Sequence, residues 1–340
     1  MMKKILFLLL ITSLITACEN QEVDFPDFDY NAVYFPIQYP VRTLSLGNDV
    51  IDNSLDRELK FHIGVSIGGM YENNENWTVE YVVDESLCEG LANDVQPLPS
   101  SWYTLEPQDQ VTIPAGSFTG LIQVQLEEAF LFDSLSTGNN YVIPLRITRS
   151  NADSILTGAP TTSDPDKLVK ADWEADAPPK DFTLFMVKYV NEYHGYYLKR
   201  GVDYGQDAFG NYTDTATYHE KYVEQDEVVS LETVSRYAIE TGYIGANSGE
   251  EYAFKIVVDP STGEATVETV DDSRYKIIGT GTGEYVPNGD SWGGEERDVF
   301  YLHYKYRVGL YGHEVFDTLV FRNRGIAYEE FVPVKQSEEK

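Results

Sequence analysis

The sequence predicts an all-β protein made of a β-sandwich followed by an antiparallel β-barrel or a second sandwich. Short segments in which apolar and polar residues alternate recur along the chain, with Gly, Pro, Asn and Asp between them. Aromatic residues make up 13% of the chain, with 25 Tyr and 16 Phe, and these residue types favour strands. No segment after Ala17 requires a helix of normal length.

The first domain is predicted to span residues 30–150. One of its segments alternates Leu59, Phe61, Ile63, Val65 and Ile67 on a single face, as a half-buried strand does. Expected strands lie within residues 31–46, 58–69, 77–83, 110–126 and 139–148. Short strands at regular spacing, separated by turn signals, are typical of an immunoglobulin-like β-sandwich.

The hydrophobic pattern fades between residues 151 and 180. This stretch is rich in Pro, Asp, Thr and Ala, and we interpret it as the linker between two domains. Trp173 is the large apolar residue within it, and we expect it to fill an interface.

The second domain is predicted to span residues 181–334, with a short tail at 335–340. Its expected strands lie within residues 182–190, 193–201, 217–225, 227–235, 251–259, 264–271, 274–283, 297–308 and 314–325. The sequence DPSTGE at residues 259–264 predicts a hairpin turn. Eight or nine antiparallel strands in about 150 residues fit a closed, lipocalin-like barrel or a second sandwich.

Residues 1–17 have the layout of a secretory signal peptide. Lys3 and Lys4 precede a short apolar run that ends in LITAC. The run is shorter than the roughly 20 residues that span a membrane. Its end resembles the bacterial lipobox, so we expect Cys18 to become the first mature residue and to carry acyl chains. The alternative is an ordinary signal peptide followed by a cysteine without a role.

Cys88 is the second of only two cysteines in the sequence. With Cys18 acylated, no disulfide can form within the mature chain, although an exported protein would be permitted one. We expect Cys88 to pack as a small hydrophobic residue.

Charge excludes one class of partner. The chain has 56 acidic and 25 basic residues, for a formal net charge of −31. Nucleic acid is therefore not an expected partner, because binding would bring like charges together. Residues 18–29 are themselves acidic, and we interpret them as a solvated tether behind the lipid anchor.

Three stretches carry a resemblance to a known family. They are ACENQEVDFPDFDYNAVYFPIQYPVRTLSLG, NNYVIPLRITRSNADSILTGAP and DWEADAPPKDFTLFMVKYVNEYHGYYLKRG. They resemble Bacteroidetes surface lipoproteins of Sus-like glycan-utilisation systems. In these proteins, an N-terminal domain of unknown function, also found ahead of family 18 glycoside hydrolases, is followed by a barrel-like domain.

The resemblance implies a lipid-anchored protein on the cell surface of the outer membrane. Its implied role is that of a non-catalytic, glycan-binding accessory protein. The implied partners are an oligosaccharide or glycan and an outer-membrane glycan transporter complex, and the lipid anchor would be the only contact with the membrane.

The sequence lacks the marks of an enzyme or a metal site. The acid pattern of family 18 hydrolases, D-x-x-D-x-D-x-E, does not occur. The segments HEKYV at His219 and HEVFD at His313 lack the second histidine of a zinc-protease motif, because Val223 and Asp317 stand at those positions. We therefore expect no catalytic residue, no metal and no cofactor.

Trp292 is the strongest candidate for sugar binding. It lies in VPNGDSWGGEERD, where glycines and a proline indicate a loop, with Asn288 and Asp290 beside it. Sugars pack their C–H faces on flat rings, and their hydroxyl groups form hydrogen bonds with such polar neighbours.

A second group of candidates comes from NEYHGYYLKRG. It contains Tyr193, Tyr197 and Arg200, which offer two rings and a hydrogen-bond donor. For each of these aromatic residues the alternative is a role in core packing.

Two other functions stay open. The protein would be a structural or adhesive surface lipoprotein if it had no sugar site. It would be a glycoside hydrolase if an unrecognised pair of carboxyl groups lay about 5 to 9 Å apart in a deep cleft.

Overall fold

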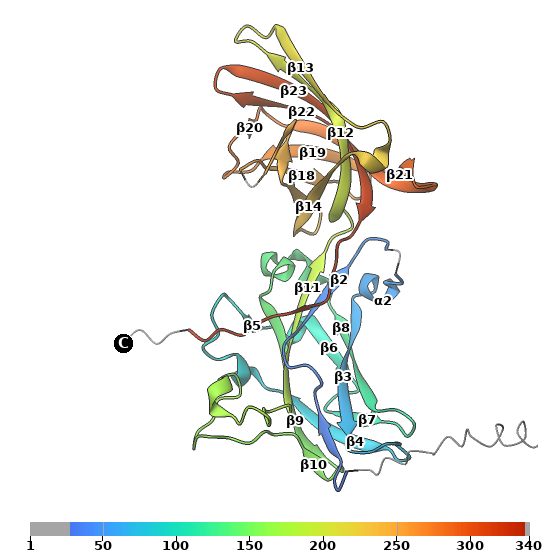
Figure 1. Ribbon diagram of the computed structural model, residues 1–340, viewed down its shortest axis with the longest axis vertical. Coiled ribbons are helices and arrows are strands. Elements are labelled where there is room, and N and C mark those ends of the chain that lie inside the picture. Colours follow the sequence, from blue (N-terminus) through green and yellow to red (C-terminus); the bar gives the residue numbers. More distant parts are fainter. Residues whose placement is uncertain (1–27, 50, 250, 337–340) are drawn as a thin grey trace, which may run out of the picture.

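The computed structural model describes residues 28–49, 51–249 and 251–336 and shows two β-domains stacked end to end (Figure 1). The all-β prediction is confirmed. Residues 1–27, with the predicted signal peptide, Cys18 and most of the acidic tether, lie outside the described residues, as do residues 337–340. Within the described ranges, no helix is long and apolar enough to cross a membrane.

The first domain packs two sheets face to face. The five-stranded sheet has the order β10-β1-β3-β8-β6, and the larger sheet has the order β24-β2-β11-β9-β4-β7, with β5 beside β9. Their bounds are β1 Ala32–Tyr34, β2 Pro40–Ser45, β3 Lys60–Gly68, β4 Trp77–Val83, β5 Gln96–Pro97, β6 Tyr103–Glu106, β7 Gln110–Ile113, β8 Thr119–Leu126, β9 Tyr141–Ser150, β10 Ser154–Ile155, β11 Phe182–Val190 and β24 Glu329–Glu330.

Helical segments in the described residues are short and lie in connections. They are α2 Ser54–Arg57, η1 Glu85–Cys88, η2 Ser100–Trp102, η3 Glu128–Phe132, η4 Ser134–Thr137, η5 Lys170–Asp172 and η6 Val223–Gln225. Cys88 lies in η1 as a buried free thiol, so it packs as a small hydrophobic residue, as expected. Burial also raises the pKa of its thiol to about 12.

The core of the first domain forms where the alternating faces of the two sheets meet. The predicted inward set of β3, from Phe61 to Ile67, is buried against β8 and the opposite sheet. Burying side chains of this size contributes roughly 1.5–3 kcal/mol each, which is why the alternation decides the register. β7 and β8 are joined by a glycine turn but enter different sheets, since β7 pairs with β4 and β8 with β3.

The predicted domain boundary needs correction. β11, assigned to the second domain from the sequence, lies in the first, where it pairs with β9 and runs parallel to β2. Residues 151–180 are not a free linker either, because β10 pairs with β1 and the rest folds onto the sandwich. The chain crosses between domains at about residues 191–194, immediately after β11.

The second domain is a closed antiparallel barrel. Its ring runs β12-β14-β15-β18-β19-β21-β22-β23, and β23 closes it by pairing with both β22 and β12. β13 extends from β12, β20 lies beside β22, and β16 pairs with β17. The bounds are β12 Gly195–Gln206, β13 Tyr212–Tyr218, β14 Glu227–Ser235, β15 Ala238–Thr241, β16 Tyr243–Ile244, β17 Asn247–Ser248, β18 Phe254–Val258, β19 Glu264–Thr269, β20 Lys276–Ile277, β21 Gly281–Trp292, β22 Glu295–Val308 and β23 Tyr311–Asn323.

Aromatic residues fill the barrel. Phe300, Tyr304 and Tyr306 of β22 point inward and are almost fully buried. The predicted hairpin turn at residues 259–264 joins β18 and β19, which pair as expected. The expected strand at 217–225 differs, because it ends at Tyr218 and continues into the turn η6.

Arg324 joins the two domains at the end of the barrel. It is 3% exposed. Its guanidinium donates hydrogen bonds to the backbone oxygens of Asn48, Glu192 and His194, at 3.2, 2.5 and 2.8 Å. Gly47 leaves room for this group, since an added Cβ there would lie 2.2 Å from the guanidinium.

The chain then returns to the first domain as a strap, residues 326–336 (Figure 1). Within it, β24 pairs with β2 at the edge of the larger sheet. Val334 accepts a hydrogen bond from the Ala92 backbone at 2.7 Å. Phe331 packs edge to face on Tyr39. The first domain is therefore completed by residues that follow the barrel in sequence.

We predict that Arg324→Ala uncouples the two domains. The variant loses three hydrogen bonds from a buried charged donor, which should lower the free energy of unfolding by about 3 kcal/mol or more. Calorimetry should show one thermal transition for the parent protein and two for the variant. Arg322→Ala, at an exposed neighbouring residue, is the matched control and should leave the transition unchanged. A single unshifted transition for Arg324→Ala would contradict this role.

Candidate functional site

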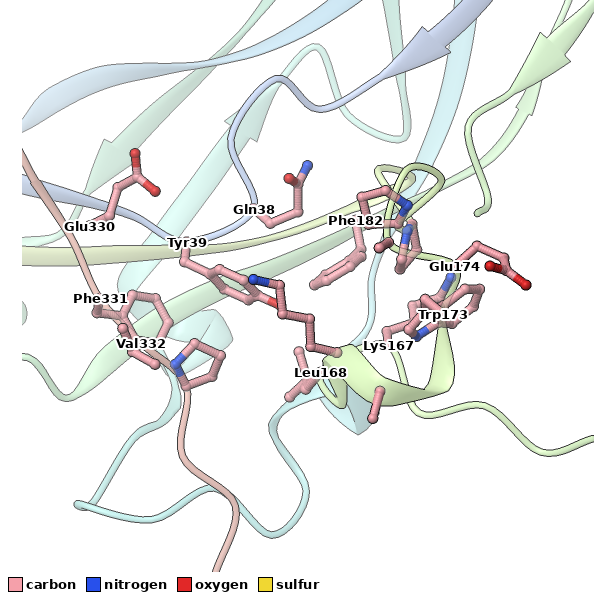
Figure 2. Close-up of a pocket in the computed structure, with 16 residues that line it drawn as sticks. Gln38, Tyr39, Lys167, Leu168, Trp173, Glu174, Phe182, Glu330, Phe331 and Val332 are labelled. Atoms are coloured by element: carbon pink, nitrogen blue, oxygen red, sulfur yellow. The ribbon is translucent and has the colours of Figure 1, made fainter. Parts of the chain in front are cut away.

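A groove of about 880 Å³ lies on the first domain (Figure 2). One wall is the strap at Glu330 to Pro333, and the opposite wall is the segment from Lys167 to Pro179. Gln38, Tyr39 and Phe182 form the base. Clefts of this size are common for small-molecule and sugar ligands, so the groove is the first candidate for a binding site.

Aromatic rings line the groove. Tyr39 contacts Phe182 and Phe331 edge to face, with ring centroids 6.0 and 5.8 Å apart. Trp173 lies on the opposite wall and is partly exposed. The Lys167 ammonium lies 5.6 Å from the centroid of the Trp173 ring. The groove thus presents two partly exposed rings, Tyr39 and Trp173, beside the buried rings of Phe182 and Phe331.

Trp173 is held in place by its local backbone. Its Nε1–H donates to the carbonyl oxygen of Asp166 at 2.8 Å. It also forms a backbone bridge with Pro160, and the Asp166 backbone donates to the Asp172 carboxylate at 2.9 Å. The Pro-rich segment that was predicted to be a linker is therefore a fixed wall, and Trp173 faces a groove instead of a domain interface.

Several polar groups in the groove are available to a ligand. The Tyr39 hydroxyl, the Lys170 ammonium and the Glu174 carboxylate have no hydrogen-bond or ion-pair partner among the residues that the structure describes. Burial is the main reason that the pKa of Tyr39 rises to about 12, so its hydroxyl keeps its proton and can donate. Lys167 is instead committed to Asp181, with both oxygens at 2.8 Å.

This combination suits a ring-shaped, hydroxyl-rich ligand. Tyr39 and Trp173 can cover the C–H faces of a pyranose, and Glu174 can accept hydrogen bonds from its hydroxyl groups. In the described ranges, no cluster of His, Cys, Asp and Glu has the arrangement of a metal site.

The predicted site residues lie elsewhere, on the barrel. Trp292 ends β21 and is followed by the turn Gly293–Gly294. Its ring is partly buried against Leu198, Val299 and Val320, and its Nε1–H donates to the Phe321 carbonyl at 2.9 Å.

The neighbours of Trp292 define what the hairpin can do. The Arg297 guanidinium lies 4.4 Å from the centroid of the indole ring and covers it. Asn288 is exposed, and its backbone donates to Asp298 at 3.0 Å, while Asp290 pairs with Arg297 in the strand register. The indole therefore closes over an apolar cluster instead of standing free as a stacking platform.

Tyr193 and Tyr197 are core residues, which corrects the expectation that they face a ligand. They are 2% and 0% exposed, and Tyr193 packs on Tyr285 with centroids 4.9 Å apart. Arg200 is on the outer surface of the barrel and is paired with Asp226 at 2.6 Å. The structure brings neither tyrosine together with Trp292 in one site.

Sequence analysis missed most of the groove because it is built from three distant segments. Tyr39, Trp173 and Phe331 are separated by more than a hundred residues, and no spacing relates them. The available signal was Trp173 itself, a large aromatic residue in a polar segment.

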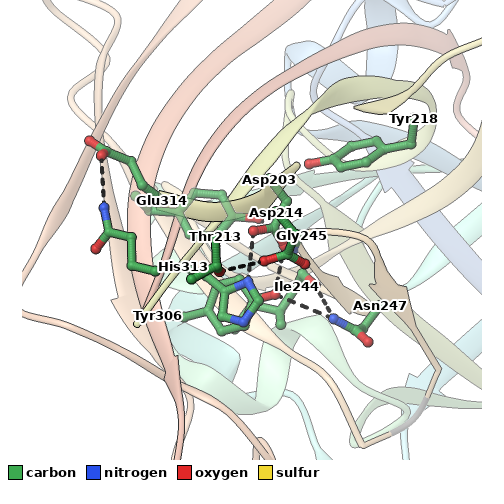
Figure 3. A network of polar contacts seen from close by, with 12 residues as sticks. Asp203, Thr213, Asp214, Tyr218, Ile244, Gly245, Asn247, Tyr306, His313 and Glu314 are labelled. Atoms are coloured by element: carbon green, nitrogen blue, oxygen red, sulfur yellow. Dashed lines mark hydrogen bonds and ion pairs between the residues drawn. The ribbon is translucent and has the colours of Figure 1, made fainter. Parts of the chain in front are cut away.

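The barrel interior holds a second set of polar groups, part of which appears in Figure 3. Asp203 accepts hydrogen bonds from the Tyr306 hydroxyl at 2.6 Å and is 2.8 Å from His313 Nδ1. Asn247 donates to the Tyr306 hydroxyl at 3.4 Å. These groups are packed among tyrosines and satisfy one another, as buried polar groups must.

Asp317 is the most deeply buried acid of this interior. It accepts hydrogen bonds from Tyr218 and, at 2.8 Å, from Tyr304. Burial outweighs these bonds and the nearby charge of Lys199, and raises the pKa of Asp317 to about 6. Lys199 is itself held by Glu227 at 2.9 Å and lies over the Tyr243 ring.

We predict that the stability of the barrel depends on pH through Asp317. Its pKa is higher in the folded than in the unfolded state, so the folded protein takes up a proton as the pH falls from 7 to 4. Relative to Asp317→Asn, which cannot titrate, the parent protein should gain up to about 3 kcal/mol over that range. Denaturant unfolding of both proteins at pH 7 and pH 4 gives their free energies of unfolding. If the difference between parent and variant were the same at both pH values, the prediction would be contradicted.

Two family models match the two parts of the chain that form the sandwich and the barrel. A family model described as a domain of unknown function, DUF5627, matches residues 192–325, and a model for an N-terminal domain matches residues 28–154. One solved structure, of a protein of unknown function from Bacteroides ovatus, is 16% identical to this chain. The match covers 90% of this chain and 100% of that one, with a TM-score of 0.42. An auxiliary nutrient binding protein from Bacteroides thetaiotaomicron is 12% identical, over 83% and 90% of the two chains, with a TM-score of 0.40. No curated protein matches the chain.

Another solved structure is much more similar to this chain. It is a Bacteroides ovatus protein of unknown function that is 35% identical, over 91% of this chain and 100% of that one, with a TM-score of 0.79. The chain therefore belongs to the same family as this Bacteroides ovatus protein, and its residues 192–325 are similar to the DUF5627 model.

Proposed function

We propose that the protein is a non-catalytic, glycan-binding accessory lipoprotein of the outer cell surface and that the groove on the first domain holds the sugar. The observation that carries the proposal is the groove of about 880 Å³ in which two partly exposed rings face unpartnered polar groups. The resemblance to surface lipoproteins of glycan-utilisation systems supports the same ligand class.

A binding role suits the groove better than hydrolysis does. Glu174 and Glu330 both line it, but they belong to different walls, with Tyr39 and Phe182 between them (Figure 2). A glycosidase needs two carboxyl groups close enough to flank a single bond, whereas Figure 2 shows Glu330 and Glu174 at opposite ends of the groove. We therefore propose that the protein captures oligosaccharides and passes them to a partner, such as an outer-membrane transporter complex.

We predict that Trp173→Ala weakens glycan binding about tenfold or more, by analogy with the roughly 1–3 kcal/mol that a nucleic-acid base gains by stacking on one aromatic ring. Tyr39→Phe keeps the ring and removes the unpartnered hydroxyl, so it should weaken binding by a smaller factor without lowering the melting temperature. A glycan array of the soluble protein from Glu19 onward would select the ligand, and calorimetric titration would give the affinities.

Phe132→Ala is the matched control for this experiment, because Phe132 is an exposed aromatic residue of the first domain away from the groove. It should bind like the parent protein. Unchanged affinity of Trp173→Ala, or turnover of the glycan by the purified protein, would overturn the proposal.

The lipid anchor has its own test. We predict that Cys18→Ala is lost from the membrane fraction or accumulates unprocessed, since the acylated thiol would be absent. Its circular dichroism should match that of the parent, because Cys18 precedes both domains. Processed Cys18→Ala protein that stays in the membrane fraction would contradict the anchor.

A further inference from the structure

The barrel carries a second polar and aromatic surface on its outside. We define the outer face as the outward side chains of β21, β22, β23 and β12. In the strand register, Thr282, His303, Phe316 and Val202 form one row across these strands. A second row is formed by Glu284, Tyr301, Thr318 and Arg200.

The outer face is hollowed along these rows. One depression of about 400 Å³ lies over β21, β22 and β23, and another of about 330 Å³ lies over β12 and β13. Thr318 lines both, so the two depressions lie next to each other across the strands. An extended ligand could therefore contact five strands at once.

Two aromatic side chains of these rows stand exposed. Tyr301 is 40% exposed and Phe316 is 44% exposed. Phe316 stacks on the His303 ring, with centroids 4.2 Å apart and planes at 7°. The Tyr301 hydroxyl donates to the Gly289 carbonyl at 3.1 Å. Both rings are thus fixed before a ligand arrives, which lowers the entropy lost on binding.

The charges of the face favour a neutral ligand. Arg200 is paired with Asp226, and His303 and Lys305 lie 2.8 and 3.3 Å from Glu314. Hydrogen bonds, chiefly from Tyr212, lower the pKa of Glu314 to about 2, so it stays charged.

One acid of the face is left over. Glu284 is exposed and has no hydrogen-bond or ion-pair partner among the described residues. Within the two rows the residual charge is therefore negative, which opposes an acidic sugar and provides acceptors for hydroxyl groups.

We propose that the outer face is a second binding site, specific for a neutral oligosaccharide. The proposal rests on the proposed function for its class of ligand, but it uses different residues in a different domain. Exposed rings cover pyranose faces, while Glu284, Thr282 and Thr318 can bind the hydroxyl groups. Trp292 contributes by closing the neighbouring row of Leu198, Val299 and Val320.

The two sites would act together on a polymer. Arg324 and the strap fix the barrel against the first domain. A long chain that occupies one site raises the local concentration of sugar at the other, so retention exceeds that of either site alone. A short oligosaccharide would occupy the sites independently.

The test is a calorimetric titration with neutral hexasaccharides of glucose, mannose and xylose, and with a hexasaccharide of galacturonic acid as the acidic probe. The parent protein should bind two neutral hexasaccharides. The double variant Tyr301→Ala/Phe316→Ala should bind one, and Glu284→Gln should weaken that same site severalfold while the fold stays intact. Tyr311→Ala, an exposed aromatic at the hairpin tip, is the matched control and should bind two.

The outcomes separate the two proposals. One bound hexasaccharide, lost in Trp173→Ala and kept in the double variant, would overturn the second site and leave the proposed groove standing. One bound hexasaccharide with the opposite dependence would support the outer face and overturn the groove. Preference for the acidic probe would overturn the specificity for neutral sugars, and no binding of any glycan would overturn both sites.

Discussion

The buried guanidinium of Arg324 is the constraint on which the arrangement of the molecule depends. It donates to backbone oxygens of Asn48, in the first domain, and of Glu192 and His194, in the crossover between the domains. A buried cation is tolerated only when its hydrogen bonds are made, so the two domains cannot rotate apart without exposing or orphaning this group. Asn191 adds to the constraint, because its amide donates to backbone oxygens of the β14–β15 hairpin at 2.9 Å.

This constraint has a consequence for the groove. Arg324 fixes the direction in which the chain leaves the barrel, and the strap that follows it supplies Phe331 to the groove. The groove is therefore complete only when the barrel has folded and the strap has paired with β2. Contacts between residues so far apart in the sequence cost more chain entropy to form than local contacts do. A ligand that contacts the strap would thus also stabilise the position of the barrel.

The sequence predicted the strands better than their partners. Alternation located β3 and the β18–β19 hairpin, because a half-buried strand and a tight turn leave local signals. It misplaced β11, whose residues are apolar on both faces. That pattern is typical of a central strand, but it does not say which sheet the strand enters. Trp292 was misjudged for a related reason, since Gly293 and Gly294 indicate a turn whether or not the preceding indole folds back on the barrel.

On both candidate surfaces of this acidic chain, nearby acidic side chains balance the basic ones. On the outer face, Arg200 is neutralised by a neighbouring acid, and Glu284 is left over. In the groove, Lys167 is neutralised by Asp181, and the free Lys170 is balanced by the free Glu174. Neither the groove nor the two rows of the outer face thus gather the positive charge that an anionic polymer would require. Recognition must then come from ring faces and hydroxyl acceptors. These groups work equally well in a chain of net charge −31, because a neutral sugar does not respond to the overall field.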